Sequence, residues 1–126
     1  MRLNRLYPSL LGFGDQSIAL LGHPYALART ALRWSFQQLC PPLSIKLILD
    51  VGCGSMPYRD IFPAAAVYHG LEIDRPCNRP NANVTHWYDG DVFPMQSSSY
   101  QLVICSQVLE HSFEPDQLLA EMFRVL

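Results

Sequence analysis

The stretch that decides the fold is Ile48-Leu49-Asp50-Val51-Gly52-Cys53-Gly54-Ser55. Its aliphatic start is typical of a buried parallel strand. It then turns on two glycines with one residue between them, as loops that carry nucleotide-like ligands do. A second strand-like run, residues 67–71, leads to Glu72, twenty residues beyond Gly52. Because an acid at about that offset can accept hydrogen bonds from a ribose, the two features together predict a cofactor-binding domain.

The composition limits the classes of function. The chain has 126 residues, of which 49% are hydrophobic and 16% are charged, as in a folded protein with a single core. The net charge of −2 provides no basic field, so we expect neither a nucleic acid nor a membrane surface as partner. The sequence contains no run of about 18 apolar residues, so we predict no membrane span. We interpret the first residues as an ordinary lead-in and not as a signal peptide.

The cysteines predict neither a metal site nor a disulfide framework. Cys40, Cys53, Cys77 and Cys105 are far apart and form no C-x-x-C pair, and no histidine lies at ligand spacing from any of them. We therefore predict free, reduced thiols and a cytoplasmic protein.

The order of the predicted elements indicates an α/β fold. Residues 1–44 form an N-terminal arm with a helix over 25–39, which Cys40-Pro41-Pro42 ends. Residues 45–126 form the cofactor-binding domain. Its predicted strands are 47–51, 67–71, 84–87 and 101–105, and a last helix begins near Pro115. Strands that alternate with helices or loops predict a wound parallel sheet.

Four motifs, in order and spacing, resemble the class I S-adenosylmethionine-dependent methyltransferases, most closely the small-molecule type called methyltransferase domain 11. They are Leu49–Gly54, Gly70–Asp74, Gly90–Pro94 and Tyr100–His111, and Val108-Leu109-Glu110-His111 is similar to a tetrapeptide common in that group. The resemblance covers residues 45–126. It implies S-adenosyl-L-methionine as cofactor and a Rossmann-like sheet in the order 3-2-1-4. Family members continue with further strands, so it also implies a C-terminally truncated half-domain.

Two stretches depart from the family pattern. The family often has a third glycine where this chain has Met56, followed by Pro57, so we expect a tighter turn or a shorter helix there. Residues 75–81 contain two prolines and cannot form a regular helix, so a loop should replace the usual crossover helix.

The resemblance implies a role for each residue around the first two strands. The backbone of Gly52, Cys53 and Gly54 would approach the cofactor without a Cβ clash; the alternative is a tight turn that binds nothing. Asp50 would contact the amino end of the cofactor, or else cap the amides of the turn. Glu72 would bind the ribose hydroxyls. Asp74 competes with Glu72 for this role, because it is two residues on and shares its face.

The remaining site residues follow the third and fourth strands. By resemblance, Asp91 accepts a hydrogen bond from the adenine amino group and the Val92 amide donates to the ring, whereas the alternative for Asp91 is a turn aspartate. Ser106 would line the cofactor pocket. His111 is the candidate catalytic base because histidine can take a proton near neutral pH, although it could equally pack under the adjoining loop.

Three hypotheses follow. The first is an S-adenosylmethionine-dependent methyltransferase acting on a small-molecule or glycan-related acceptor, with oxygen, nitrogen and carbon all open as the methylated atom. The second is a truncated, non-catalytic binding or scaffold module, and the third, less favoured, is a nicotinamide-binding Rossmann domain. Truncation would also leave residues 102–104 on an unpaired edge, which predicts self-association or binding of a complementing fragment.

Overall fold

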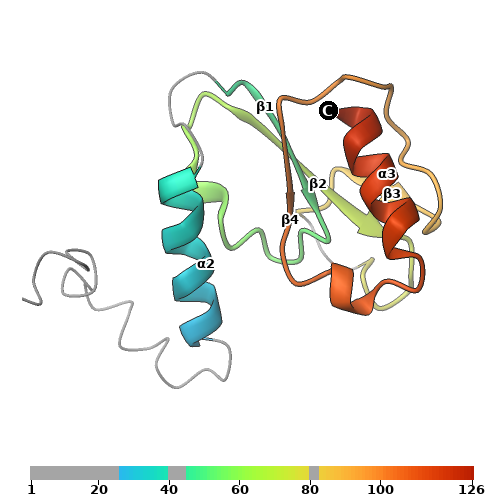
Figure 1. Cartoon of the computed structure of the whole chain (residues 1–126), viewed down its shortest axis with the longest axis horizontal. Helices are drawn as coiled ribbons and strands as arrows, with labels where there is room; N and C mark the ends of the chain where they lie inside the picture. The colour runs from blue at the N-terminus through green and yellow to red at the C-terminus, as the bar shows by residue number, and fades with distance from the viewer. Residues whose placement is uncertain (1–25, 40–44, 80–82) are drawn as a thin grey trace, which may run out of the picture. The chain divides into compact units, whose positions relative to one another are not determined.

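The computed structural model describes residues 26–39, 45–79 and 83–126. The chain divides into two compact units, Met1–Cys40 and Pro41–Leu126. The described part of the first unit is the helix α2, Ala26–Leu39, within one residue of the predicted helix (Figure 1). Alanine, leucine, arginine and glutamine, all good helix formers, make up most of it. The predicted arm before residue 26 and the predicted proline stop lie outside the described residues.

The second unit is built on a four-stranded parallel sheet in the order β3-β2-β1-β4, which confirms the predicted topology (Figure 1). Its strands are β1 Leu47–Val51, β2 Val67–Ile73, β3 His86–Tyr88 and β4 Leu102–Cys105. The first strand has the predicted bounds. The second runs two residues further than predicted, because residues 71–73 pair with the whole of β3. This extension places Glu72 inside the sheet ladder.

One face of the sheet carries the apolar core. Leu49, Val51 and Leu71 are completely buried there and pack with the last helix, α3, Pro115–Val125. Leu118 and Val125 are the buried residues of α3, which begins with Pro115 at its first turn, as predicted. Phe93 and Tyr100, from the connection between β3 and β4, complete this core. The predicted last helix therefore exists and fixes which face of the sheet is left for the β1–β2 connection.

The opposite face contacts that connection. Tyr68 lies there, with its ring centroid 5.8 Å from that of Phe62 and 5.4 Å from the guanidinium carbon of Arg59. The only helix in the connection is the 3₁₀ turn η2, Arg59–Ile61, so the expected shortening of the first helix is confirmed. Residues 75–79 form turns and no helix, in agreement with the expected loop, whereas 80–82 are outside the described residues.

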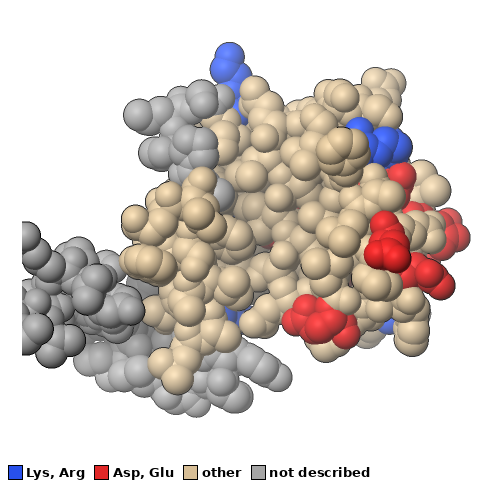
Figure 2. All heavy atoms as spheres, in the orientation of Figure 1, with Lys and Arg blue, Asp and Glu red and all other residues tan. Residues whose placement is uncertain are grey.

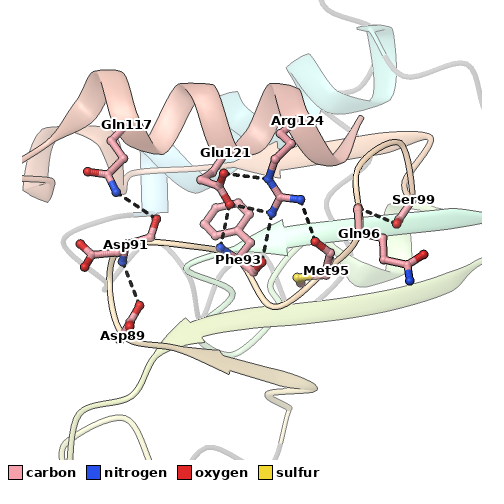
Figure 3. A network of polar contacts seen from close by, with 9 residues as sticks. All are labelled: Asp89, Asp91, Phe93, Met95, Gln96, Ser99, Gln117, Glu121 and Arg124. Carbon is pink, nitrogen blue, oxygen red and sulfur yellow. Dashed lines mark hydrogen bonds and ion pairs between the residues drawn. The ribbon is translucent and has the colours of Figure 1, made fainter.

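A polar fork on α3 holds the connection that precedes β4 (Figure 3). Arg124 donates to the carbonyl oxygens of Phe93 (3.0 Å) and Met95 (2.8 Å). Glu121 accepts the backbone N–H of Phe93 (2.8 Å) and pairs with Arg124 (2.7 Å). The hydrogen bonds from Arg124 lower the pKa of Glu121, so this ion pair persists at neutral pH. The fork thus fixes the path of the chain between β3 and β4.

Candidate functional site

The glycine loop lies at the carboxyl end of β1, where ligands bind in α/β sheets. Gly52 and Gly54 both have positive φ, +67° and +47°. A Cβ on Gly52 would collide with the side chain of Val108, so packing requires this glycine. A Cβ on Gly54 would meet nothing within 4 Å. The protein therefore leaves room beside Gly54, where the backbone can approach a ligand.

Met56, which stands where the family often has a third glycine, has a backbone conformation that glycine adopts readily. Its φ is +53°, in the left-handed region that glycine adopts readily and other residues adopt at a cost. Its N–H donates to the carbonyl oxygen of Cys53 (2.7 Å). Its methyl group and the Cys53 thiol fill the space beside Gly70, where a Cβ would clash with both. The loop thus holds a non-glycine residue in the left-handed region at this position.

Glu72 projects from β2 to the glycine loop. Its Oε2 accepts the backbone N–H of Gly54 (3.3 Å), and its Oε1 accepts a hydrogen bond from Asn78 Nδ2 (3.4 Å). Asn78 is itself tied to the carbonyl oxygen of Ile73 (3.0 Å). This arrangement holds a carboxylate next to the open side of the loop, where the hydroxyl groups of a ribose could donate hydrogen bonds to it.

Asp74, the competing acid, is engaged elsewhere. Both of its carboxylate oxygens accept hydrogen bonds from Arg79, at 2.8 and 3.0 Å. These hydrogen bonds lower the pKa of Asp74, which is exposed at the surface. Of the two acids, Glu72 is the one in contact with the glycine loop, and the geometry favours it as the ligand-binding acid.

Asp50 is buried, with 3% of its surface exposed. Its Oδ2 accepts a hydrogen bond from the Tyr68 hydroxyl (2.8 Å), and no hydrogen bond from the turn amides reaches it within the described residues. Burial raises its pKa to about 6; the Tyr68 hydrogen bond opposes that rise, and Glu72 adds to it. The structure therefore differs from the capping alternative: Asp50 is held by a tyrosine from the neighbouring strand.

Cys53 contributes its backbone and not a reactive thiol. The side chain is buried, and burial, with Asp50 and Glu72 nearby, raises its pKa to about 12. A thiol that stays protonated is a poor nucleophile. Cys53, Cys77 and Cys105 are free thiols, and Cys40 lies outside the described residues.

The end of β4 brings Ser106 toward the same loop. Its Oγ lies 3.5 Å from the hydroxyl of the buried Tyr58, and Val108 packs against Gly52. His111 is in the following 3₁₀ turn η3, Leu109–His111, with its side chain exposed and with no side-chain hydrogen bond in the described part of the chain. The structure therefore does not show His111 packed under the adjoining loop.

Asp91 and Val92 follow β3 at the same carboxyl edge. Two hydrogen bonds fix the Asp91 backbone (Figure 3). Its N–H donates to Asp89 Oδ1 (3.1 Å), and its carbonyl oxygen accepts from Gln117 Nε2 (3.3 Å). Its carboxylate and the Val92 side chain are exposed. Within the described residues, no hydrogen bond or ion pair joins either of them to Glu72. Both residues follow β3 and lie outside the hydrogen-bonded group of Glu72, Gly54 and Asn78.

The surface beside η3 is acidic. Figure 2 shows Asp and Glu side chains gathered over η3 and the start of α3, where Glu110, Glu114 and Asp116 are exposed.

In the described ranges, no group of three or more His, Cys, Asp or Glu residues could hold a metal ion. No helix in the same ranges is long and apolar enough to cross a membrane.

Tyr68 is a site residue that the sequence motifs do not predict. The strand register contains a signal for it: Ile48 pairs with Tyr68 and Asp50 pairs with Gly70. Residues two apart on a strand share a face, so Tyr68 is the diagonal neighbour of Asp50, within reach of a long aromatic side chain. In sequence terms, Tyr68 stands two residues before Gly70, the residue that pairs with Asp50.

The comparison with known families gives a single clear result. Residues 49–126, more than half of the chain, match the family model described as Methyltransferase domain. The chain belongs to the methyltransferase domain family. Together with the sheet order, this match confirms the resemblance to class I S-adenosylmethionine-dependent methyltransferases and the Rossmann-like α/β fold. It also favours a methyltransferase over a nicotinamide-binding domain. No curated protein matches the sequence significantly.

Proposed function

We propose that this methyltransferase domain binds S-adenosylmethionine at the carboxyl ends of β1, β2 and β4. The observation that carries the proposal is the Glu72 carboxylate, whose Oε2 accepts the Gly54 N–H at 3.3 Å. A Cβ added to Gly54 would meet nothing within 4 Å, so there is room beside this carboxylate. A carboxylate next to an open glycine backbone suits a ribose with two adjacent hydroxyl groups. The family match supports the same cofactor.

Each predicted residue has a distinct task in this proposal. Glu72 accepts hydrogen bonds from the ribose hydroxyls, and the backbone of Gly52, Cys53 and Gly54 lies against the methionine part. Asp50 attracts the ammonium group, while the exposed Asp91 and the Val92 N–H hold the adenine. Ser106 lines the β4 side. When bound, the cofactor supplies an electrophilic methyl group on a sulfonium.

The acceptor we propose is a small molecule, with a glycan-related compound included. His111 is exposed beyond the carboxyl end of β4, where it can take a proton from the acceptor. Positioning of the acceptor would supply most of the acceleration. The His111→Gln variant should therefore lower turnover and leave cofactor affinity unchanged.

A second candidate is a binding module that associates through β4. In the described part of the chain, β4 pairs on one side only, with β1, which leaves a row of unpaired backbone groups. Leu102 and Val103 flank that edge, but Val103 also packs against the core, so a lysine there would damage the fold as well. Leu102→Lys is the cleaner variant. Sedimentation should show self-association of the wild type at tens of micromolar and less for Leu102→Lys; a wild type that stays monomeric would contradict the edge proposal.

Calorimetric titration with S-adenosylmethionine and S-adenosylhomocysteine tests the cofactor proposal. Both should bind the wild type. Glu72→Gln should weaken binding about tenfold or more, because each lost charged hydrogen bond contributes roughly 1.5–3 kcal/mol. Asp74→Asn is the matched control: it removes the neighbouring acid, which Arg79 already occupies, and should leave the affinity unchanged. Equal losses in both variants, or no heat with the wild type, would contradict the proposal.

A further inference from the structure

Asp50 and Tyr68 form a buried hydrogen-bonded pair beneath the glycine loop. Only 3% of Asp50 and 9% of Tyr68 are exposed, and the hydroxyl lies 2.8 Å from Oδ2. The other oxygen, Oδ1, accepts no hydrogen bond. Because no fully buried side-chain polar atom lacks a partner in the described part of the chain, Oδ1 keeps some access to solvent. One oxygen is thus fixed by the tyrosine and the other can face a ligand.

Among the described residues, no cation forms an ion pair with Asp50. Arg59 lies over the Tyr68 ring, and its guanidinium donates to the carbonyl oxygens of Pro63 (3.5 Å) and Ala66 (3.0 Å).

Of the other titratable groups around Asp50, none favours its charge, and Glu72 opposes it. Glu72 on β2 is acidic. The Cys53 thiol of the glycine loop and the Cys105 thiol of β4 both sense the Asp50 charge, and burial keeps them protonated. The Tyr68 hydroxyl is therefore the one group that stabilises the carboxylate against burial.

We propose that Tyr68 is a positioning residue of the cofactor site: its hydroxyl fixes the Asp50 carboxylate for the cofactor's ammonium group and so sets the pH range in which the site binds. This inference rests on the proposed function. An ammonium group binds an ionised carboxylate and not a protonated one. Since burial raises the pKa of Asp50 to about 6, the protonation state of this one residue would control binding near neutral pH.

The test is the pH dependence of binding by the full chain. Wild-type affinity for S-adenosylhomocysteine should fall as the pH is lowered through about 6. Tyr68→Phe removes the hydrogen bond to the charged form, so the midpoint should move up by about one pH unit. Binding by the variant should then be about fivefold weaker than wild type at pH 6 and similar at pH 8. Adenosine, which lacks the ammonium group, should show no such pH dependence in either protein.

Tyr100→Phe is the matched control. Tyr100 is buried to a similar extent, and its hydroxyl lies 2.9 Å from His69 Nδ1 on the opposite face of the sheet. A purely structural effect of losing a buried hydroxyl would appear in both variants, whereas the shifted midpoint should appear in Tyr68→Phe alone.

The outcomes separate the two proposals. If wild-type protein binds S-adenosylhomocysteine and Tyr68→Phe keeps the wild-type midpoint, the role of Tyr68 is overturned and the proposed function stands. If the wild type does not bind at any pH, both are overturned. Urea unfolding without ligand supplies a second readout: the pH dependence assigned to Asp50 should extend to higher pH in Tyr68→Phe, and an unchanged profile would refute the coupling.

Discussion

Replacing Asp50 by asparagine should stabilise the protein at neutral pH. Burial raises the pKa of Asp50 from the ordinary value of 3.8 to about 6, so the folded state holds the proton more tightly than the unfolded state. The stability that this group contributes is therefore fully present below pH 3.8 and is lost as the pH rises through about 6. At about 1.4 kcal/mol per pKa unit, the loss amounts to roughly 3 kcal/mol.

Asparagine has nearly the same shape and can still accept the Tyr68 hydrogen bond, but it carries no charge. Urea unfolding of both proteins between pH 4 and pH 8 measures the difference. Asp50→Asn should gain stability relative to wild type by up to about 3 kcal/mol between pH 4 and 7, and the gain should level off above pH 7. A difference between the two proteins that does not change with pH would refute this reasoning.

Three further predictions concern the supports of the site. Arg124→Met should lower the urea midpoint more than Arg79→Met, because Arg124 holds two loop carbonyls and Arg79 forms an exposed pair. Gly52→Ala should destabilise by more than about 1 kcal/mol, and Val108→Ala in the same chain should recover the part due to the clash; equal stability of single and double variants would contradict the packing argument. Burial lowers the pKa of His86, so the stability that this histidine contributes is lost as the pH falls below 6.5. In urea unfolding, the His86→Gln variant should therefore lose less stability than the wild type below that pH.

The sheet could be predicted from the sequence because each of its strands carries a local signal. The run Leu47–Val51 is apolar except for Asp50, as expected of a strand covered on both faces, and it has the predicted bounds. The short strand His86–Tyr88 is displaced from its prediction, because its pairing with the end of β2 sets its position and its own composition does not. Strand ends that depend on a partner strand leave little trace in the local sequence.

The site was predictable where one residue type performs a task alone. Two glycines and an acid at the end of a second strand carry their own pattern, and the structure brings Gly54 and Glu72 into contact. The Asp50–Tyr68 bond was missed because it joins residues eighteen apart through the register of two strands. Met56 and Pro57 correctly predicted a shortened first helix, but the positive φ of Met56 has no signal in its residue type.

Mapping of backbone amide chemical shifts on addition of S-adenosylhomocysteine tests the central claim most directly. The account predicts that the amides of residues 52–55 move, together with those of Glu72, Val92 and Ser106, while the amides on the exposed side of α3 stay in place. Saturating shifts confined to α3, or a spectrum unchanged at millimolar ligand, would contradict a cofactor site at the carboxyl ends of β1, β2 and β4.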